Sequence, residues 1–121
     1  MSDLPPPEET STPEIQAQPH SRDAEEAVLG AVLINPEVYF DIAQFLQPED
    51  FFIVRNRWIW EAFVHLHERR IPLDYLTISQ ELEDKGQLAE IGGPSYLTAL
   101  ISQTPTSLHA EAYARTVEQE S

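Results

Sequence analysis

The chain has 121 residues, enough for one domain with a single hydrophobic core. It carries 7 Lys and Arg against 21 Asp and Glu, a formal net charge of -14, so nucleic acid should repel it unless a basic patch is sharply segregated. It has no cysteine, which excludes disulfides and thiolate metal sites. With no export signal and no apolar run of the ~20 residues that a membrane span needs, the sequence predicts a cytoplasmic protein.

Residues 1–18 are predicted to form a disordered, acidic, proline-rich tail. The segment contains four prolines and four acidic residues but no Lys, Arg or aromatic residue. Such a composition buries too little apolar surface to offset the entropy lost on ordering. A short docking peptide is the alternative interpretation. The globular domain is therefore expected to occupy residues 19–121.

The first helix is expected to begin at Ser21, a good N-cap. Asp23 and Glu25 would then lie in its first turn, where carboxylates interact favourably with the helix dipole. Residues 27–34 are apolar on nearly every face, which predicts a central helix. Gly30 within it costs about 1 kcal/mol relative to Ala, so we expect another helix to cross closely at this point.

Asn35 followed by Pro36 predicts a second helix that begins there and runs through Leu46. A third, long helix is expected over about residues 54–70. Its apolar residues recur at i, i+4 and i+7, which is the spacing of one helix face. The central stripe of this face is Ile59, Phe63 and Leu66.

Pro72 ends the third helix, and Asp74 is the expected N-cap of a fourth, which closes at Lys85 and Gly86. Glu81 and Lys85 are expected to form an i, i+4 ion pair on its exposed side.

A fifth helix is expected to open at Pro94, and residues 104–105 break it. Thr106 or Ser107 should cap the last helix. Its predicted apolar face is Leu108, Tyr113 and Val117. No turn sequence typical of a β-hairpin occurs. The fold is therefore predicted to be all-α, a compact orthogonal bundle of about six helices.

The sequence offers little support for catalysis. A phosphate-binding loop needs glycines followed by Lys, but the only lysine, Lys85, precedes the only glycine pair, residues 92–93. Glu61 and His65 are spaced to share a metal, yet two ligands make an incomplete site and a solvated pair is the simpler interpretation. No nucleophile elbow of the G-x-S-x-G type is present. We expect no catalytic residue, cofactor or metal in this chain.

Five sequence blocks in register resemble one family, the bacterial replicative hexameric DNA helicases of the DnaB-like type. Residues 19–30 include D-A-E-E-A-V-L-G, similar to the family's opening E-A-E-Q-A-V-L-G. The further blocks are residues 48–52, 73–77, 87–93 and 113–117. The resemblance extends from about Pro19 to the C-terminus. It implies the non-catalytic N-terminal collar domain, without the motor domain.

The resemblance also implies partners. In the family this domain helps hexamers to assemble and docks primase, and sometimes a helicase loader, during chromosome replication. ATP and Mg²⁺ are expected only in the ATPase domain of the full-length protein, an ATP-dependent 5'-3' DNA helicase. The chain stops at Ser121, about where the family's helical hairpin would begin. We therefore expect a monomer or dimer rather than a ring.

Three residues are candidates for partner binding: Asp23, Tyr96 and Trp58. Asp23 matches the first acid of the E-A-E motif, and Tyr96 matches the tyrosine after Gly-Gly-x-x; the family places both positions at or near primase-related function. The simpler interpretations are a first-turn dipole partner for Asp23 and a packed core residue for Tyr96. The family usually keeps an aromatic residue at the position of Trp60 and tolerates polar residues at that of Trp58. Trp60 is thus the better core candidate, and Trp58 a candidate contact.

The alternative function is a nucleic-acid-binding module of the helix-turn-helix type, with Arg55 and Arg57 as its readers. Such modules normally carry a basic face. Residues two apart do not share a helix face, and Arg69 and Arg70 are better placed to complement the C-terminal dipole of their helix. The charge distribution therefore disfavours this alternative.

Overall fold

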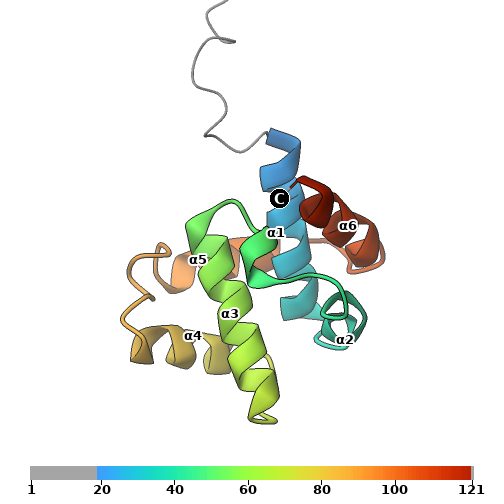
Figure 1. Ribbon diagram of the computed structural model, residues 1–121. Coiled ribbons are helices and arrows are strands. Elements are labelled where there is room, and N and C mark those ends of the chain that lie inside the picture. The colour runs from blue at the N-terminus through green and yellow to red at the C-terminus, as the bar shows by residue number, and fades with distance from the viewer. Residues whose placement is uncertain (1–18, 121) are drawn as a thin grey trace, which may run out of the picture.

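The structure, a computed structural model, describes residues 19–120 (Figure 1). The predicted tail, residues 1–18, lies outside the described residues. Within them the chain forms six α-helices, one short 3₁₀ turn and no strand, which confirms the all-α prediction. These elements are α1 (Pro19–Ile34), α2 (Val38–Ile42), η3 (Pro48–Asp50), α3 (Val54–Glu68), α4 (Tyr75–Asp84), α5 (Pro94–Ser102) and α6 (Ala110–Glu120).

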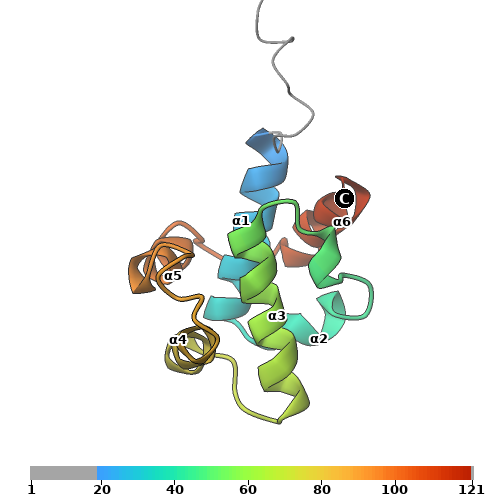
Figure 2. The same ribbon diagram turned by 60° about the vertical axis from the view of Figure 1, so that its left-hand side comes forward.

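Helices α1 and α3 form the centre of the bundle. Figures 1 and 2 both show α4 and α5 on one side of this pair and α2 and α6 on the other. The most extensive packing is between α1 and α6. These two helices are antiparallel: Ser21, early in α1, donates a hydrogen bond to Glu120 at the end of α6, and Asn35, just after α1, donates one to Ser107, just before α6.

The start of α1 differs from the prediction. Ser21 is not the N-cap, because α1 already includes Pro19 and the buried Ser21 hydroxyl bonds across to α6. No acidic residue lies in the first turn, so the interpretation of Asp23 and Glu25 as first-turn dipole partners is wrong. The two carboxylates have different surroundings, because Asp23 is exposed and Glu25 is buried.

The close crossing predicted at Gly30 is confirmed. A Cβ atom at this position would overlap Thr104 Oγ1 and would lie 2.7 Å from the carbonyl oxygen of Leu100. The Thr104 hydroxyl donates to that same carbonyl, at 2.7 Å, and so closes the last turn of α5 against α1. Only glycine permits this separation of the two backbones.

An aromatic cluster around Trp60 fills the core. The fully buried Trp60 ring lies 5.3 Å from that of Tyr39, 5.5 Å from that of Phe51 and 5.5 Å from that of Phe63, measured between centroids. These rings come from α2, from the segment after η3 and from α3, so the cluster joins three elements. Trp58 is half-buried and packs against the edge of the core. The predicted central stripe of α3 is buried as well.

The second helix is shorter than predicted. The sequence predicts a helix from Asn35 through Leu46, whereas α2 covers only Val38–Ile42 and has Glu37 at its N-cap. The Asn35 side chain does not cap α2, because its amide nitrogen donates to Ser107 Oγ at 3.2 Å.

The predicted ends of α4 are confirmed. Asp74 Oδ1 accepts a hydrogen bond from the Thr77 amide at 2.9 Å, and Thr77 Oγ1 accepts one from the Asp74 amide at 3.0 Å, which together form a capping box. At the other end Lys85 is the C-cap, and Gly86 has a φ of 71°, in the left-handed region that favours glycine.

Glu81 is buried rather than exposed, which corrects the prediction for α4. Its i, i+4 contact with Lys85 forms at 3.8 Å, but its carboxylate also lies 3.3 Å from Arg69 Nη1 and 3.4 Å from His65 Nδ1. These contacts join the C-terminal end of α3 to α4. They also give His65 an acidic neighbour other than Glu61.

Helix α6 begins later than predicted, and its buried face matches the predicted one only at Val117. Leu108 precedes the helix and is 77% exposed, and Tyr113 is 43% exposed. The buried face consists of Ala110, Ala114 and Val117. Because alanine side chains are small, α6 packs closely on α1 and the Tyr113 ring stays at the surface.

The aromatic cluster predicts unequal effects of the two tryptophans on stability. Trp60→Ala should lower the free energy of unfolding by roughly 3–5 kcal/mol, because it removes a fully buried ring and leaves a cavity. Trp58→Ala should cost far less, since that ring is only half-buried. Urea denaturation of both variants measures the difference. A larger loss for Trp58→Ala would contradict the orientation of α3.

The crossing at Gly30 yields a second prediction. Alanine is intrinsically better in a helix by about 1 kcal/mol, yet Gly30→Ala should destabilise the domain by roughly 1–3 kcal/mol because the added methyl overpacks the crossing. Adding Thr104→Ala removes the overlap with Thr104 Oγ1 but leaves the Leu100 carbonyl oxygen at 2.7 Å and the Cβ of residue 104 at 2.9 Å, so the double variant should recover only part of the loss in thermal denaturation. A gain in stability for Gly30→Ala alone would show that the crossing is not tight.

Candidate functional site

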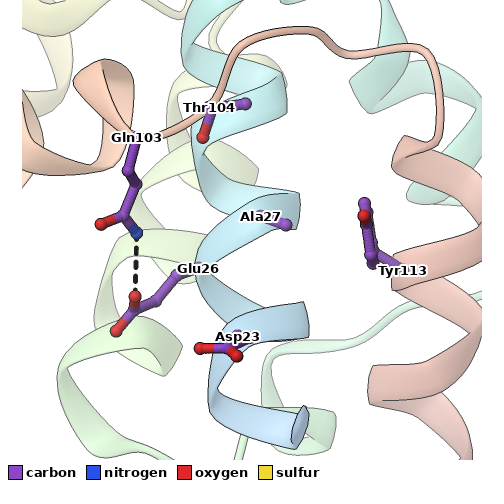
Figure 3. Close-up of a pocket in the computed structure, with 6 residues that line it drawn as sticks. All are labelled: Asp23, Glu26, Ala27, Gln103, Thr104 and Tyr113. Carbon is purple, nitrogen blue, oxygen red and sulfur yellow. Dashed lines mark hydrogen bonds between the residues drawn. The ribbon is translucent and has the colours of Figure 1, made fainter.

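A cleft of about 290 Å³ opens on the surface between α1, the end of α5 and α6. Figure 3 shows Glu26 and Gln103 to one side of α1 and Tyr113, on α6, to the other. Asp23 and Thr104 lie towards the two ends of the cleft, and the small side chain of Ala27 lies between them. The residues that line it are Asp23, Glu26, Ala27, Gln103, Thr104 and Tyr113.

Helical spacing and the crossing at Gly30 bring these residues together. Asp23, Glu26 and Ala27 share one face of α1, because residues three and four apart are neighbours on a helix. Gln103 is the C-cap of α5, and the crossing places it against α1. There its side-chain amide donates to Glu26 Oε1 at 2.8 Å.

The two carboxylates of the cleft have different surroundings. Glu26 accepts the Gln103 hydrogen bond and lies 4.0 Å from Arg55 Nη2, and its side chain is only 16% exposed. Asp23 is exposed, and no described residue pairs with it. Together with the 43% exposed Tyr113 ring, Asp23 gives the cleft an accessible negative charge beside an accessible aromatic face.

A buried polar network next to the cleft joins α1, α3 and α5. Glu25, 2% exposed, accepts hydrogen bonds from the amides of Phe52 at 2.6 Å and Ile53 at 3.3 Å, and from Asn56 Nδ2 at 2.9 Å. The Tyr96 hydroxyl donates to Asn56 Oδ1 at 2.5 Å. Ile53 is the N-cap of α3 and its side chain makes no capping hydrogen bond, and Glu25, from another helix, accepts the amide of this N-cap residue.

Tyr96 is engaged on both its hydroxyl and its ring. Its hydroxyl bonds to Asn56, and the Arg55 guanidinium lies 4.4 Å from its ring centroid. Burial raises the pKa of the Tyr96 hydroxyl, and the neighbouring Arg55 only partly offsets this effect. The structure therefore agrees with the simpler interpretation of Tyr96 as a packed residue, and through Arg55 and Glu26 it also links Tyr96 to the cleft.

Burial also raises the pKa of Glu25 above its ordinary value of 4.5. The hydrogen bonds from Asn56 and from the amides of Phe52 and Ile53 act in the opposite direction, as does the charge of Arg57, without cancelling the desolvation. The folded state thus binds this proton more tightly than the unfolded chain. The contribution of Glu25 to stability is fully present below pH 4.5 and is lost as the pH rises through the folded-state pKa.

The structure does not bring the three predicted partner-binding residues into one site. Asp23 lines the cleft, and Tyr96 lies in the adjacent network. Trp58 is half-buried and is not among the residues that line the cleft.

Sequence reasoning missed most of the residues around Asp23. The spacing from Asp23 could have identified Glu26 and Ala27 as its neighbours on α1. Gln103 and Tyr113 are 80 and 90 residues away from Asp23 in the sequence, and no pattern indicates that they meet α1 here. They follow only from the packing of the helices.

Among residues 19–120, no three His, Cys, Asp or Glu side chains gather to hold a metal ion. The two arginines of the nucleic-acid alternative are both engaged within the fold: Arg55 stacks on Tyr96, and Arg57 donates to the carbonyl oxygen of Phe51 at 3.0 and 3.3 Å. None of the described helices combines the length and hydropathy of a membrane span.

The family model for the DnaB-like helicase N-terminal domain matches residues 17–119. The chain belongs to this family. Over 103 residues it is 42% identical to the replicative DNA helicase DnaB of Geobacillus stearothermophilus and 37% identical to the replicative DNA helicase DnaC of Bacillus subtilis, and each alignment covers 85% of this chain and 23% of the relative. It is also 33% identical, over 108 residues, to the replicative DNA helicase DnaB of Haemophilus influenzae, an alignment that covers 89% of this chain and 23% of that protein.

A solved structure shares the fold. The crystal structure of the N-terminal domain of DnaB helicase from Mycobacterium tuberculosis superposes with a TM-score of 0.77 at 36% identity, over 80% of this chain and 69% of that one. The resemblance of the five sequence blocks to this family is therefore confirmed. The chain spans about a quarter of the length of the curated relatives.

The raised pKa of Glu25 predicts a specific dependence of stability on pH. Glu25→Gln should lower the free energy of unfolding by roughly 1–3 kcal/mol, because an NH₂ group replaces one of the two carboxyl oxygens that face the donors of Phe52, Ile53 and Asn56. The difference from wild type should be largest below pH 4.5 and should narrow as the pH rises through the folded-state pKa. Urea denaturation from pH 4 to pH 8 gives the profile. A carboxyl pKa at or below 4.5, measured by NMR titration, would contradict the predicted direction.

Proposed function

We propose that this domain works by protein contact within a replicative DNA helicase, in assembly with other helicase subunits and in docking primase or a helicase loader. Membership of the helicase N-terminal domain family supports the setting, since the relatives are named as replicative DNA helicases. The observation that carries the docking role is the exposed carboxylate of Asp23, which has no partner among the described residues and borders an open cleft.

A stable framework beneath Asp23 supports this proposal. On one side of α1, Glu25 fixes the helix to α3 and, through Asn56, to α5. On the other side, α1 packs along α6 and hydrogen bonds join these helices near both ends. A surface that is already ordered loses little conformational entropy when a partner binds.

The proposal assigns no catalysis to this domain. Unwinding, ATP and Mg²⁺ would belong to an ATPase domain in the full-length protein, acting in the cytoplasm. Trp58 remains a candidate contact, and its half-buried ring would contribute less area than a fully exposed one.

Calorimetry with the C-terminal domain of the cognate primase tests the docking role. The 121-residue chain should bind at most weakly, and a chain extended through the family's helical hairpin should bind more tightly, because part of the docking surface would lie in that hairpin. Equal affinity of the two chains, or no binding by the longer one, would exclude the role proposed for this domain.

Nucleic-acid binding is the competing outcome. A chain with a net charge of -14 and with Arg55 and Arg57 engaged internally should not bind labelled oligonucleotides at physiological salt in fluorescence anisotropy. Micromolar binding that weakens as salt is added would favour the helix-turn-helix alternative instead.

A further inference from the structure

We propose that the cleft between α1 and α6 receives a single arginine side chain from the partner protein. In this arrangement the guanidinium pairs with Asp23 and stacks on the Tyr113 ring, while Glu26 contributes negative charge from the opposite wall. The inference rests on the docking function proposed above and specifies its chemistry.

The shape of the cleft suits one long side chain. Its volume of about 290 Å³ admits a side chain rather than a helix or strand. Ala27 keeps the space over α1 open between Asp23 and Thr104, and Tyr113 faces this space from α6 (Figure 3). A side chain that enters over Ala27 therefore has a carboxylate at one end and an aromatic face beside it.

The charge of the cleft favours a cationic ligand. Two of its six lining residues are acidic, and none is Lys or Arg. Arg55 compensates Glu26 from outside the cleft, but no described residue compensates Asp23. The net charge of -14 adds a long-range field that attracts a basic partner towards this surface.

The molecule already contains the proposed arrangement in its own side chains. The Arg55 guanidinium lies 4.4 Å from the centroid of the Tyr96 ring and 4.0 Å from the Glu26 carboxylate, which is a stacked cation beside an acid. Arg115 likewise lies 3.6 Å from the centroid of the Phe45 ring. Asp23 and Tyr113 provide an acid and an aromatic ring of the same kind, and the arginine of the partner would complete the arrangement.

Arginine fits these partners better than lysine. Its planar guanidinium can stack on a ring and still direct N–H groups at a carboxylate, whereas an ammonium group is more strongly hydrated and makes a point contact. Stacking of a cation on an aromatic ring and pairing with an exposed carboxylate are each weak, so the cleft would add selectivity to a larger interface rather than supply its whole affinity.

NMR titration of the ¹⁵N-labelled 121-residue chain with Nα-acetyl-arginine amide tests the cleft directly. Saturable shifts should cluster on the residues around Asp23, Ala27 and Tyr113. Nα-acetyl-citrulline amide, which has the same shape but no charge, should not produce them, and the lysine analogue should bind more weakly. Scattered, non-saturating shifts, or equal shifts with citrulline, would overturn the proposal.

Three variants identify the groups responsible. Asp23→Asn and Tyr113→Leu should each weaken arginine binding by about fivefold, because each removes one exposed contact. Ala27→Leu keeps the charge but fills the space, and should abolish binding while the remaining spectrum shows an intact fold. The control is Asp41→Asn, the same chemical change at an exposed position on α2, which should have no effect. If Asp41→Asn weakened arginine binding equally, the effect would be one of overall charge and the proposed site would be wrong.

A second arm separates this inference from the docking function. If the hairpin-extended chain binds the primase domain equally well with and without Asp23→Asn, docking stands and the arginine site is wrong. If arginine amide binds the cleft but the primase domain does not bind the extended chain, the arginine site stands and primase is the wrong partner.

Discussion

The arrangement of α3 and α5 against α1 depends on the hydrogen bonds of one buried carboxyl group, that of Glu25. Glu25 accepts hydrogen bonds from the chain as it enters α3, where Ile53 offers no capping side chain. Through Asn56 the same group reaches Tyr96 on α5. Desolvation makes the charge costly to bury, and the hydrogen bonds that converge on it offset part of that cost. Three helices thus share one polar junction within an otherwise apolar core.

The cleft lies at the surface next to this polar junction, on another face of α1. Glu25 and Glu26 are neighbours in the sequence, but a helix turns by about 100° per residue, so one faces α3 and the other faces the end of α5. Asp23 and Ala27 then lie on the side that faces solvent beside α6. On α6, Ala110 and Ala114 are buried, whereas Tyr113 of the same helix lines the cleft.

Local signals predicted the elements well and their contacts less well. The crossing at Gly30 was predictable because glycine weakens an apolar helix and is favoured there only where another backbone comes close. Ser21 was misassigned because a hydroxyl near a helix start can cap the helix or bond to another helix, and only the position of α6 decides between them. Within the site, Asp23 was identified by resemblance to a family, since an exposed acid has no local signature. Gln103 and Tyr113 join it through tertiary packing, which no short sequence pattern encodes.

The antiparallel pairing of α1 and α6 has a mechanical consequence. Ser21 meets Glu120 at one end of the pair, and Asn35 meets Ser107 at the other. The start of α1 and the end of α6 therefore lie side by side, at the same pole of the domain (Figure 1). Tension applied to these two ends would break the contacts between α1 and α6 one after another, starting from the end at Ser21 and Glu120, rather than all at once.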